Sequence, residues 1–389
     1  MTIADLVRAL ESIAPPELAE AWDNVGLLVG DPAAGVAGEG PVLATIDLDE
    51  PVLDEAIEMN ARLIVAYHPV LFAPVKRLTT ASATGRILMK CVQHGVAVYS
   101  PHTALDAAAG GVADWLLGVC AGAGSADGGV TRIDSRAALT GAAMGGGGAF
   151  KVAVFVPVEP PEVLVRVRDA MAGAGAGRIG AYDTCSFRTM GVGSFRGDAT
   201  SNPAVGVRGR LESVEEHKLE MVCPGSALPA VIAAIRGAHP YEEPAFDVYA
   251  MTTPARTDLG AGRVGTLATP VSVSDLAARV KRGLGVHAAQ YAAAGGDPAR
   301  RVSRVAVCPG SGASLLDAAA AAGAEVFVTG EMKHHEVRGA LERGISIVLA
   351  GHTETERGYL PVLARKLETA APGVKVMVSR VDRAPLAWA

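Results

Sequence analysis

The sequence predicts an α/β protein in which two similar α/β halves form one platform, divided by an inserted ferredoxin-like α+β domain. Three observations support this fold class. Short β-branched runs alternate with helical patterns up to about residue 119, and the same alternation resumes at Gly262. A glycine-rich segment at 141–148 interrupts the pattern, and a different order of elements follows it. We therefore expect the first half at 1–145, the insert at 146–252 and the second half at 253–389.

The first half begins with a helix. Thr2 is a suitable N-cap, apolar residues recur at helical spacing as far as Ala14, and Pro15 and Pro16 stop the helix. Strands separated by helices then follow, which implies a mostly parallel sheet. The expected strands are 41–48, 63–66 and 96–99, and the expected helices are 51–60, 83–94 and 110–119.

The expected insert follows a run of glycines at 145–148, which is typical of a flexible joint. Its order of strand, helix, strands, helix and strand is that of a split βαβ, ferredoxin-like domain. The elements are a strand at 150–157, a helix at 161–173, strand-like alternation over 206–222, a helix at 228–237 and a strand at 245–251.

The second half repeats the alternation of the first, so it belongs to the same α/β class. Its last helix is the longest expected in the chain and would close the fold. The expected helices are 273–283, 311–323, 334–344 and 353–369, and the expected strands are 302–307, 324–329 and 345–350.

Composition excludes several classes of function. The chain has 389 residues, 50% of them hydrophobic, and a formal net charge of -6. This acidic balance argues against nucleic acid as a partner. No window approaches the roughly 18 uninterrupted apolar residues of a membrane span, and the charged N-terminal helix is unlike a signal peptide. The five cysteines are scattered without a CxxC pair, so we expect a cytoplasmic protein without disulfides or a cysteine-based zinc site.

Three polar loops follow expected strands and contain imidazole and carboxylate groups. They contain His68, then His102 with Asp106, and finally His352 with Glu356. Ligands of open α/β sheets bind beyond the carboxyl ends of the strands, so these loops can converge on one site. Imidazole and carboxylate are ligand types of zinc, iron and manganese. The sequence therefore predicts a site for a divalent metal.

Each of these signals has a plainer interpretation when it is taken alone. His352 and Glu356 share a helix face because they are four residues apart, but surface neighbours often have this spacing. His68 is equally compatible with a hydrogen-bonded core histidine, and Asp106 with a helix cap. The coincidence of three such loops at equivalent positions is what favours a metal site.

Six segments in order along nearly the whole chain resemble the NIF-3-like family (Ngg-1-interacting factor 3), whose bacterial members are often labelled GTP cyclohydrolase type 2 homologues. The resemblance implies two similar α/β halves that carry a dinuclear metal site. It also implies a PII-like or CutA-like insert and a homohexameric ring. The segments are AWDNVGLLVG, YHPVLFAPVKRLT, HTALDAAAGGVADWL, HPYEEPAFDVY, TGEMKHHEV and GHTETERGYL.

The resemblance also implies a set of ligands for up to two divalent metals per chain. His68 and Asp106 would hold one metal, His352 the other, and Glu356 would bridge both. Many bacterial members have a second histidine where this chain has Tyr67. A phenol titrates near 10 and is a poor ligand at neutral pH, so the second metal should bind more weakly.

Two classes of function remain open at this stage. In the first, the protein is a metal-dependent hydrolase that acts on an unnamed small molecule, because a bound metal lowers the pKa of water to about 7. His334 or His335 would serve as general acid or base, with His102 also close to the centre. In the second, the protein is a metal chaperone or a regulatory ring without catalysis. No GxxxxGK[ST] phosphate loop is present, and the turn at 309–312 is compatible with an anion site or a plain strand-to-helix turn.

Overall fold

The computed structural model describes residues 1–36, 40–122, 133–140, 149–179, 182–251 and 258–387. The chain divides into two compact units. We call Met1–Ala142 together with Ala255–Ala389 the platform unit, and Ala143–Pro254 the inserted unit. The glycine-rich joint expected at 141–148 lies outside the described residues.

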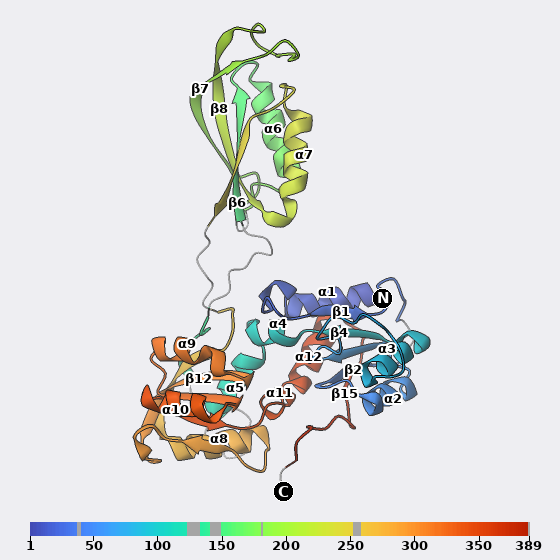
Figure 1. The fold of residues 1–389 in the computed structure, drawn as a ribbon, viewed down its shortest axis with the longest axis vertical. Coiled ribbons are helices and arrows are strands. Elements are labelled where there is room, and N and C mark those ends of the chain that lie inside the picture. Colours follow the sequence, from blue (N-terminus) through green and yellow to red (C-terminus); the bar gives the residue numbers. More distant parts are fainter. Residues whose placement is uncertain (37–39, 123–132, 141–148, 180–181, 252–257, 388–389) are drawn as a thin grey trace. The chain divides into compact units, whose positions relative to one another are not determined.

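The first sheet of the platform unit has the strand order β1-β4-β3-β2-β15. Strands β15, β2, β3 and β4 are parallel, and the edge strand β1 runs antiparallel to β4. Helices α1 and α12 cover one face, and α2 and α3 cover the other (Figure 1). The bounds are α1 Ile3–Ile13, β1 Gly26–Val29, β2 Val42–Thr45, α2 Glu50–Glu58, β3 Leu63–Ala66, α3 Ala83–His94, β4 Ala97–Ser100, α12 Leu360–Ala370 and β15 Val376–Val378.

Strand β3 shows why this sheet is buried on both faces. All four of its residues are apolar and buried. Leu63 and Val65 pack beneath α1, while Ile64 and Ala66 pack against α2 and α3, as the alternation of side chains along a strand requires. The chain that leaves β3 therefore emerges at a fixed position, and the next residues are Tyr67 and His68.

The second sheet has the strand order β11-β14-β13-β12-β10-β5. Strands β12, β13 and β14 are parallel, and the other three pair antiparallel. Helices α5 and α8 cover one face, and α9 and α10 the other. The bounds are α5 Val112–Cys120, β5 Ile133–Ala137, β10 Arg263–Ser272, α8 Val273–Leu284, β11 Gln290–Ala292, β12 Arg301–Ser311, α9 Leu316–Ala321, β13 Val326–Glu331, α10 His334–Glu342 and β14 Ser346–Leu349.

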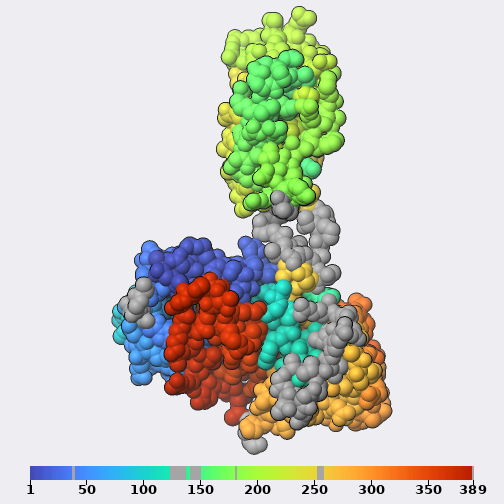
Figure 2. Space-filling view, turned by 180° about the vertical axis from the view of Figure 1, so that it is seen from behind, coloured from blue at the N-terminus to red at the C-terminus, as the bar shows by residue number. Residues whose placement is uncertain are grey.

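The two halves of the platform unit exchange elements. Helix α12 and strand β15 come from the end of the chain but belong to the first sheet, whereas α5 and β5 come from the first half and belong to the second. In Figure 2 the C-terminal segments (red) accordingly lie against the N-terminal segments (blue). This exchange ties the halves together and brings the loop after β3 close to the loop after β14.

The long helix expected at 353–369 is wrong. The structure has the short helix α11 (Glu354–Arg357) followed by α12, with a break at Gly358. A Cβ added to Gly358 would lie 2.5 Å from the ring of Trp115, so the chain here packs too closely against α5 for a longer side chain. Helix α4 (His102–Ala107) was also not expected, and it contains Asp106 within its length. None of the helices in the described ranges has both the length and the apolar character needed to cross a membrane.

The inserted unit is a four-stranded antiparallel sheet with the order β7-β8-β6-β9. Helices α6 and α7 lie side by side on one face of it (Figure 1), over a core that includes Val154 and Leu219. Strand β7 was not expected, and its residues are mostly exposed. Its classification as a PII-like or CutA-like domain stays a prediction. The bounds are β6 Ala149–Pro157, α6 Glu162–Gly173, β7 Ser186–Arg196, β8 Leu211–Pro224, α7 Leu228–Ala238 and β9 Phe246–Met251.

Candidate metal centre

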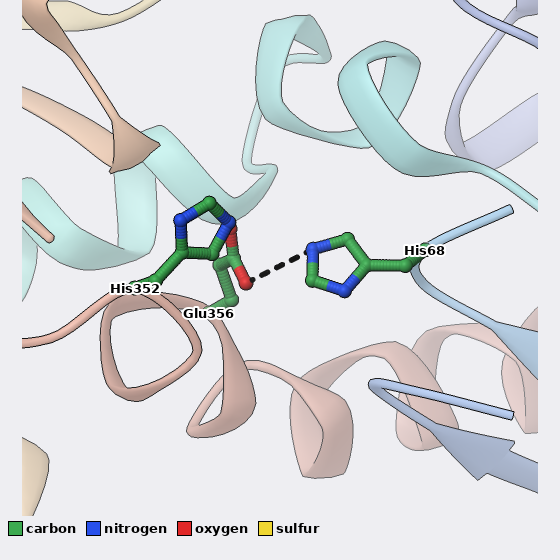
Figure 3. Close-up of side chains that lie close together, drawn as sticks. All are labelled: His68, His352 and Glu356. Atoms are coloured by element: carbon green, nitrogen blue, oxygen red, sulfur yellow. Dashed lines mark ion pairs between the residues drawn. The ribbon is translucent and has the colours of Figure 1, made fainter. Parts of the chain in front are cut away.

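Three of the residues expected to bind metal converge in the platform unit. His68 follows β3 of the first sheet, His352 follows β14 of the second, and Glu356 lies in α11 (Figure 3). One ligand atom from each of these residues lies within 4.8 Å of the others. Two sheets thus contribute to one cluster of imidazole and carboxylate groups, as the equivalent loop positions predict.

Glu356 lies between the two imidazoles. Its Oε2 is 3.4 Å from Nε2 of His68, and its Oε1 is 3.5 Å from Nε2 of His352. The residue is only 4% exposed, and no hydrogen-bond donor among the described residues satisfies its Oε2. A buried carboxylate oxygen without a partner is costly, and a divalent cation between the three groups would remove that cost. The residues present therefore fit a metal.

Gly310 keeps space open beside this carboxylate. Its φ is +64°, and a Cβ added there would lie 2.6 Å from Oε1 of Glu356 and 3.2 Å from Nε2 of His352. The N–H of Gly310 donates to the Thr355 hydroxyl at 2.9 Å, and its carbonyl accepts from the Thr329 hydroxyl at 3.1 Å. The backbone of Gly310 is therefore engaged by neighbouring loops, and this part of the glycine-rich turn packs against the metal centre.

Each histidine of the cluster has a second carboxylate at its other ring nitrogen. Nδ1 of His68 lies 2.9 Å from Oδ1 of Asp47, and Nδ1 of His352 lies 3.0 Å from Oε1 of Glu331. Metal-binding histidines commonly donate their second N–H to a carboxylate, which fixes the ring and its tautomer. The sequence analysis missed both acids. Their position at the ends of β2 and β13, the strands next to β3 and β14, is the signal that would have found them.

His102 lies beside His68, with ring centroids 5.4 Å apart. Its Nδ1 is 2.7 Å from Oδ1 of Asp23, whose carboxylate also accepts from the Thr103 N–H at 3.1 Å. The φ of His102 is +29°, which is unusual for a residue with a side chain. The pattern of an imidazole held by a carboxylate therefore occurs three times around this centre.

Tyr67 and Asp106 form a hydrogen bond next to the cluster. The Tyr67 hydroxyl donates to Oδ1 of Asp106 at 2.5 Å. Burial, together with the charges of Asp106 and Glu356, raises the pKa of Tyr67 well above 10, so the residue stays a neutral phenol. Burial also raises the pKa of Asp106 well above its usual range, although the Tyr67 hydroxyl opposes this shift. Asp106 is therefore not a helix cap but a buried carboxyl group that Tyr67 holds in place.

The carboxylates give this centre a strong preference for positive charge. Burial disfavours the charged form of His68, but its hydrogen bond with Asp47 and the charges of Asp47 and Glu356 outweigh burial and raise the pKa of His68 to about 10. Burial alone would raise the pKa of Asp47, but His68 lowers it below its usual range. A metal would compete with protons for these groups and would bring the positive charge that they favour.

The two histidines proposed for proton transfer lie at the start of α10. His334 and His335 are both exposed, and neither belongs to the three-residue cluster. They follow Glu331, the residue that holds His352, by three and four positions. Their role stays a prediction.

The fold and this centre define an α/β protein with a candidate metal site at the junction of two sheets. The chain belongs to the Duf34/NIF3 family (NGG1p interacting factor 3), whose profile matches residues 1–385. The resemblance noted in the sequence is therefore confirmed.

Relatives of known sequence and structure cover most of the chain. A Bacillus subtilis protein named GTP cyclohydrolase 1 type 2 homolog is 36% identical over 388 residues, covering 98% of this chain and 97% of the relative. A Mycobacterium tuberculosis protein of the same name is 37% identical over 333 residues, covering 86% and 82%. The crystal structure of a Bacillus cereus protein related to NIF3 matches with a TM-score of 0.70 at 33% identity, covering 100% and 99%. A Staphylococcus aureus protein matches with a TM-score of 0.76 at 25% identity, with the same coverage.

Proposed function

We propose that this protein is a divalent-metal-dependent hydrolase of the GTP cyclohydrolase type 2 homologue class, acting on a small molecule. The observation that carries the proposal is the buried Glu356 carboxylate, whose Oε2 has no donor among the described residues while two Nε2 atoms face it. His68, Asp106, His352 and Glu356 would hold up to two ions of zinc, iron or manganese. A bound ion supplies Lewis acidity and lowers the pKa of water to about 7.

The protein's own side chains would orient the centre and handle protons. Asp47 and Glu331 hold the two imidazoles with Nε2 toward Glu356, so neither ring needs to reorient when a ligand arrives. Tyr67 leaves the second oxygen of Asp106 available, because its hydrogen bond uses only Oδ1. We propose His334 and His335 as the groups that exchange protons with a substrate, because their exposed side chains follow directly after the strand that supplies Glu331.

Two cavities give a substrate access to this centre. One of about 390 Å³ reaches His352 and is lined by Glu331, Glu354 and residues 384–387 near the C-terminus. Another of about 440 Å³ reaches His68 and is lined by Asp47. Both volumes lie within the range of roughly 300–1,000 Å³ that is usual for small-molecule sites.

Turnover tests the proposal directly. Protein loaded with zinc, iron or manganese would be incubated with GTP, other nucleotides and phosphoesters, and the products followed by chromatography. We expect at least one compound to be converted by the unmodified protein and none by Glu356→Ala. The matched control is Glu58→Ala, which removes an exposed carboxylate of α2 that belongs neither to the cluster nor to the lining of either cavity. If the loaded protein converts nothing but transfers its metal to other proteins, the chaperone hypothesis is correct instead.

The resemblance to the family also supports a homohexameric ring with a PII-like insert and a cytoplasmic location. Sedimentation of the purified chain measures its oligomeric state. A single species of six times the chain mass of 39.6 kDa is the expected result.

A further inference from the structure

The inserted unit contains a cavity that the metal centre does not use. It has a volume of about 420 Å³ and is lined by parts of β6, β7 and β8, by Gly197, Ser201 and residues 203–205 between β7 and β8, and by residues 241–243 and Ala245. Residues of β6 and β8 alternate between the two faces of the sheet, with Val154 and Leu219 beneath the helices. Phe155 and Glu216 point to the opposite face, so the cavity lies on the side that α6 and α7 leave uncovered.

Four residues of the HPYEEPAFDVY segment line this cavity: Tyr241, Glu242, Glu243 and Ala245. The first of them is held in place by its neighbour. His239 is buried, and its Nε2 donates to the Phe155 carbonyl at 2.9 Å while its Nδ1 accepts the Tyr241 N–H at 3.1 Å. The two rings also pack edge to face, with centroids 4.8 Å apart. The position of Tyr241 is thus fixed before any ligand arrives, which lowers the entropy cost of binding.

The polar end of the cavity is formed by Tyr241 and Glu216. The Tyr241 hydroxyl is buried and makes no hydrogen bond of good geometry with any residue in the described part of the chain. Burial and, to a smaller extent, the nearby Glu216 carboxyl raise the pKa of Tyr241 to about 12. The side chain of Glu216 covers Gly193 of β7. A Cβ added to Gly193 would lie 2.0 Å from Oε2 of Glu216. Glycine at this position therefore leaves the carboxyl group beside the phenol.

The lining defines the chemistry of a ligand. Three carboxylates, those of Glu216, Glu242 and Glu243, line the cavity with a single cation, Arg196. Among the described residues these carboxylates do not come close enough together to form a metal-binding group. The aromatic rings of Phe155, Phe195 and Tyr241 favour an organic body and attract an ammonium group. Burial raises the pKa of Glu216, and a cation beside it would offset the cost of burying its charge.

We propose that the inserted unit binds small organic amines, with the ammonium group between Glu216 and the Tyr241 hydroxyl and an aromatic or apolar body against Phe155 and Phe195. This site is independent of the metal centre. It gives a role to the one family segment that lies outside the platform unit.

Calorimetric titration of the full-length, metal-free protein tests the proposal with three probes of the same ring system: tryptamine, indole and 3-indolepropionate. We expect tryptamine to bind saturably, and the neutral and anionic probes to bind at least tenfold more weakly. Glu216→Gln should weaken tryptamine binding about tenfold or more, because a hydrogen bond to a charged group is lost. Tyr241→Phe removes an uncharged hydroxyl that would accept from the ammonium group, and should weaken tryptamine binding about threefold to tenfold.

Two matched controls locate the site. Glu215→Gln removes the same charge from the neighbouring position of β8, whose side chain points to the opposite face, and Tyr249→Phe removes a hydroxyl on β9 outside the cavity. Both should leave tryptamine binding unchanged. The proposal is overturned if the unmodified protein fails to bind tryptamine at millimolar concentration, if all three probes bind equally, or if Glu216→Gln and Tyr241→Phe bind as the unmodified protein does.

Discussion

His68 and His239 are partly or fully buried histidines in different units, and their surroundings are opposite in kind. The ring nitrogens of His68 face the carboxylates of Asp47 and Glu356, and its pKa is raised to about 10. Both nitrogens of His239 bond to the backbone, and burial lowers its pKa below 6.5. One imidazole therefore sits where positive charge is favoured, and the other is a neutral link between two segments. The comparison shows that the partners of a histidine decide its role.

The two ends of the metal centre differ in a similar but smaller way. The side chains of His68 and Asp47 are 23% and 41% exposed, whereas those of His352 and Glu331 are 38% and 58% exposed. Tyr67 and Asp106 add further buried groups on the His68 side. A charge interaction is stronger where water is excluded, so the His68 side should hold a cation more tightly.

The largest effect is expected from removing Glu356, the group that both imidazoles face. Glu356→Ala should abolish stoichiometric metal binding, because the remaining residues lose the carboxylate between them. The metal-free variant should still fold, but it should be less stable near pH 7 than the metal-free parent, because Glu356 is one of the carboxylates that raise the pKa of His68. Elemental analysis and urea unfolding measure both quantities. Unchanged metal content would contradict the assignment.

Replacing the carboxylates behind the histidines should separate the two ends of the centre. Asp47→Asn should lower metal affinity by about 10–100-fold, the range typical for such partners. Glu331→Gln should have a smaller effect, because its side chain is 58% exposed and water can replace it. Competition with a chromogenic chelator measures the affinities. Equal losses, or a larger loss in Glu331→Gln, would show that the two ends are equivalent.

Tyr67→Phe tests whether the phenol positions Asp106. Removing the hydroxyl leaves Oδ1 of Asp106 without its donor, which should lower the free energy of unfolding of the metal-free protein by about 1–2 kcal/mol. Tyr99→Phe on the adjacent strand β4 is the control, because the Tyr99 hydroxyl bonds to no described residue. Urea unfolding gives both values. If the Tyr67→Phe variant is as stable as the Tyr99→Phe variant, the Tyr67 hydroxyl does not hold Asp106 in place.

Much of the fold could be predicted because local patterns and the sheet agree. The run of residues 63–66 is apolar throughout and becomes a strand buried on both faces. The break near Gly358 could have been predicted, because Pro361 has no N–H to donate to the Arg357 carbonyl and its ring clashes with that carbonyl. The close packing of Gly358 against Trp115 could not be predicted, because these residues are more than two hundred positions apart in the chain. Strand β7 could not be predicted from its burial, because its apolar residues Phe187, Met190 and Val192 are exposed and do not mark a core-facing side.

The candidate site was predictable in part. Polar residues at strand ends indicated His68, His352 and Glu356, and the structure brings these together. Asp47 and Glu331 were missed because an acid after a strand is common, and only the pairing of neighbouring strands shows which histidine each one meets. The opposite pKa shifts of His68 and His239 could also not be predicted, because they depend on partners that are distant in the sequence.

The smallest effect is expected when the pH is lowered. It concerns His239 and the stability of the inserted unit. Burial lowers the pKa of His239 in the folded protein; the Phe155 carbonyl opposes this shift and the charge of Arg166 adds to it. Below about pH 6.5, the usual histidine value, the unfolded chain therefore binds more protons than the folded one at this position. Its contribution to the stability of the inserted unit is present above pH 6.5 and is lost as the pH falls toward the lower folded value.

Hydrogen exchange of peptides from 149–179 and 182–251, corrected for the intrinsic rate at each pH, measures this loss. Protection should fall between pH 7.5 and 5.5. Arg166→Gln removes the nearby positive charge and should make the fall shallower, because the pKa of His239 then lies closer to its unfolded value. Tyr241 also contacts the ring, and its phenol stays neutral over this range. Protection that rises on acidification would mean that His239, like His68, is stabilised in its charged form.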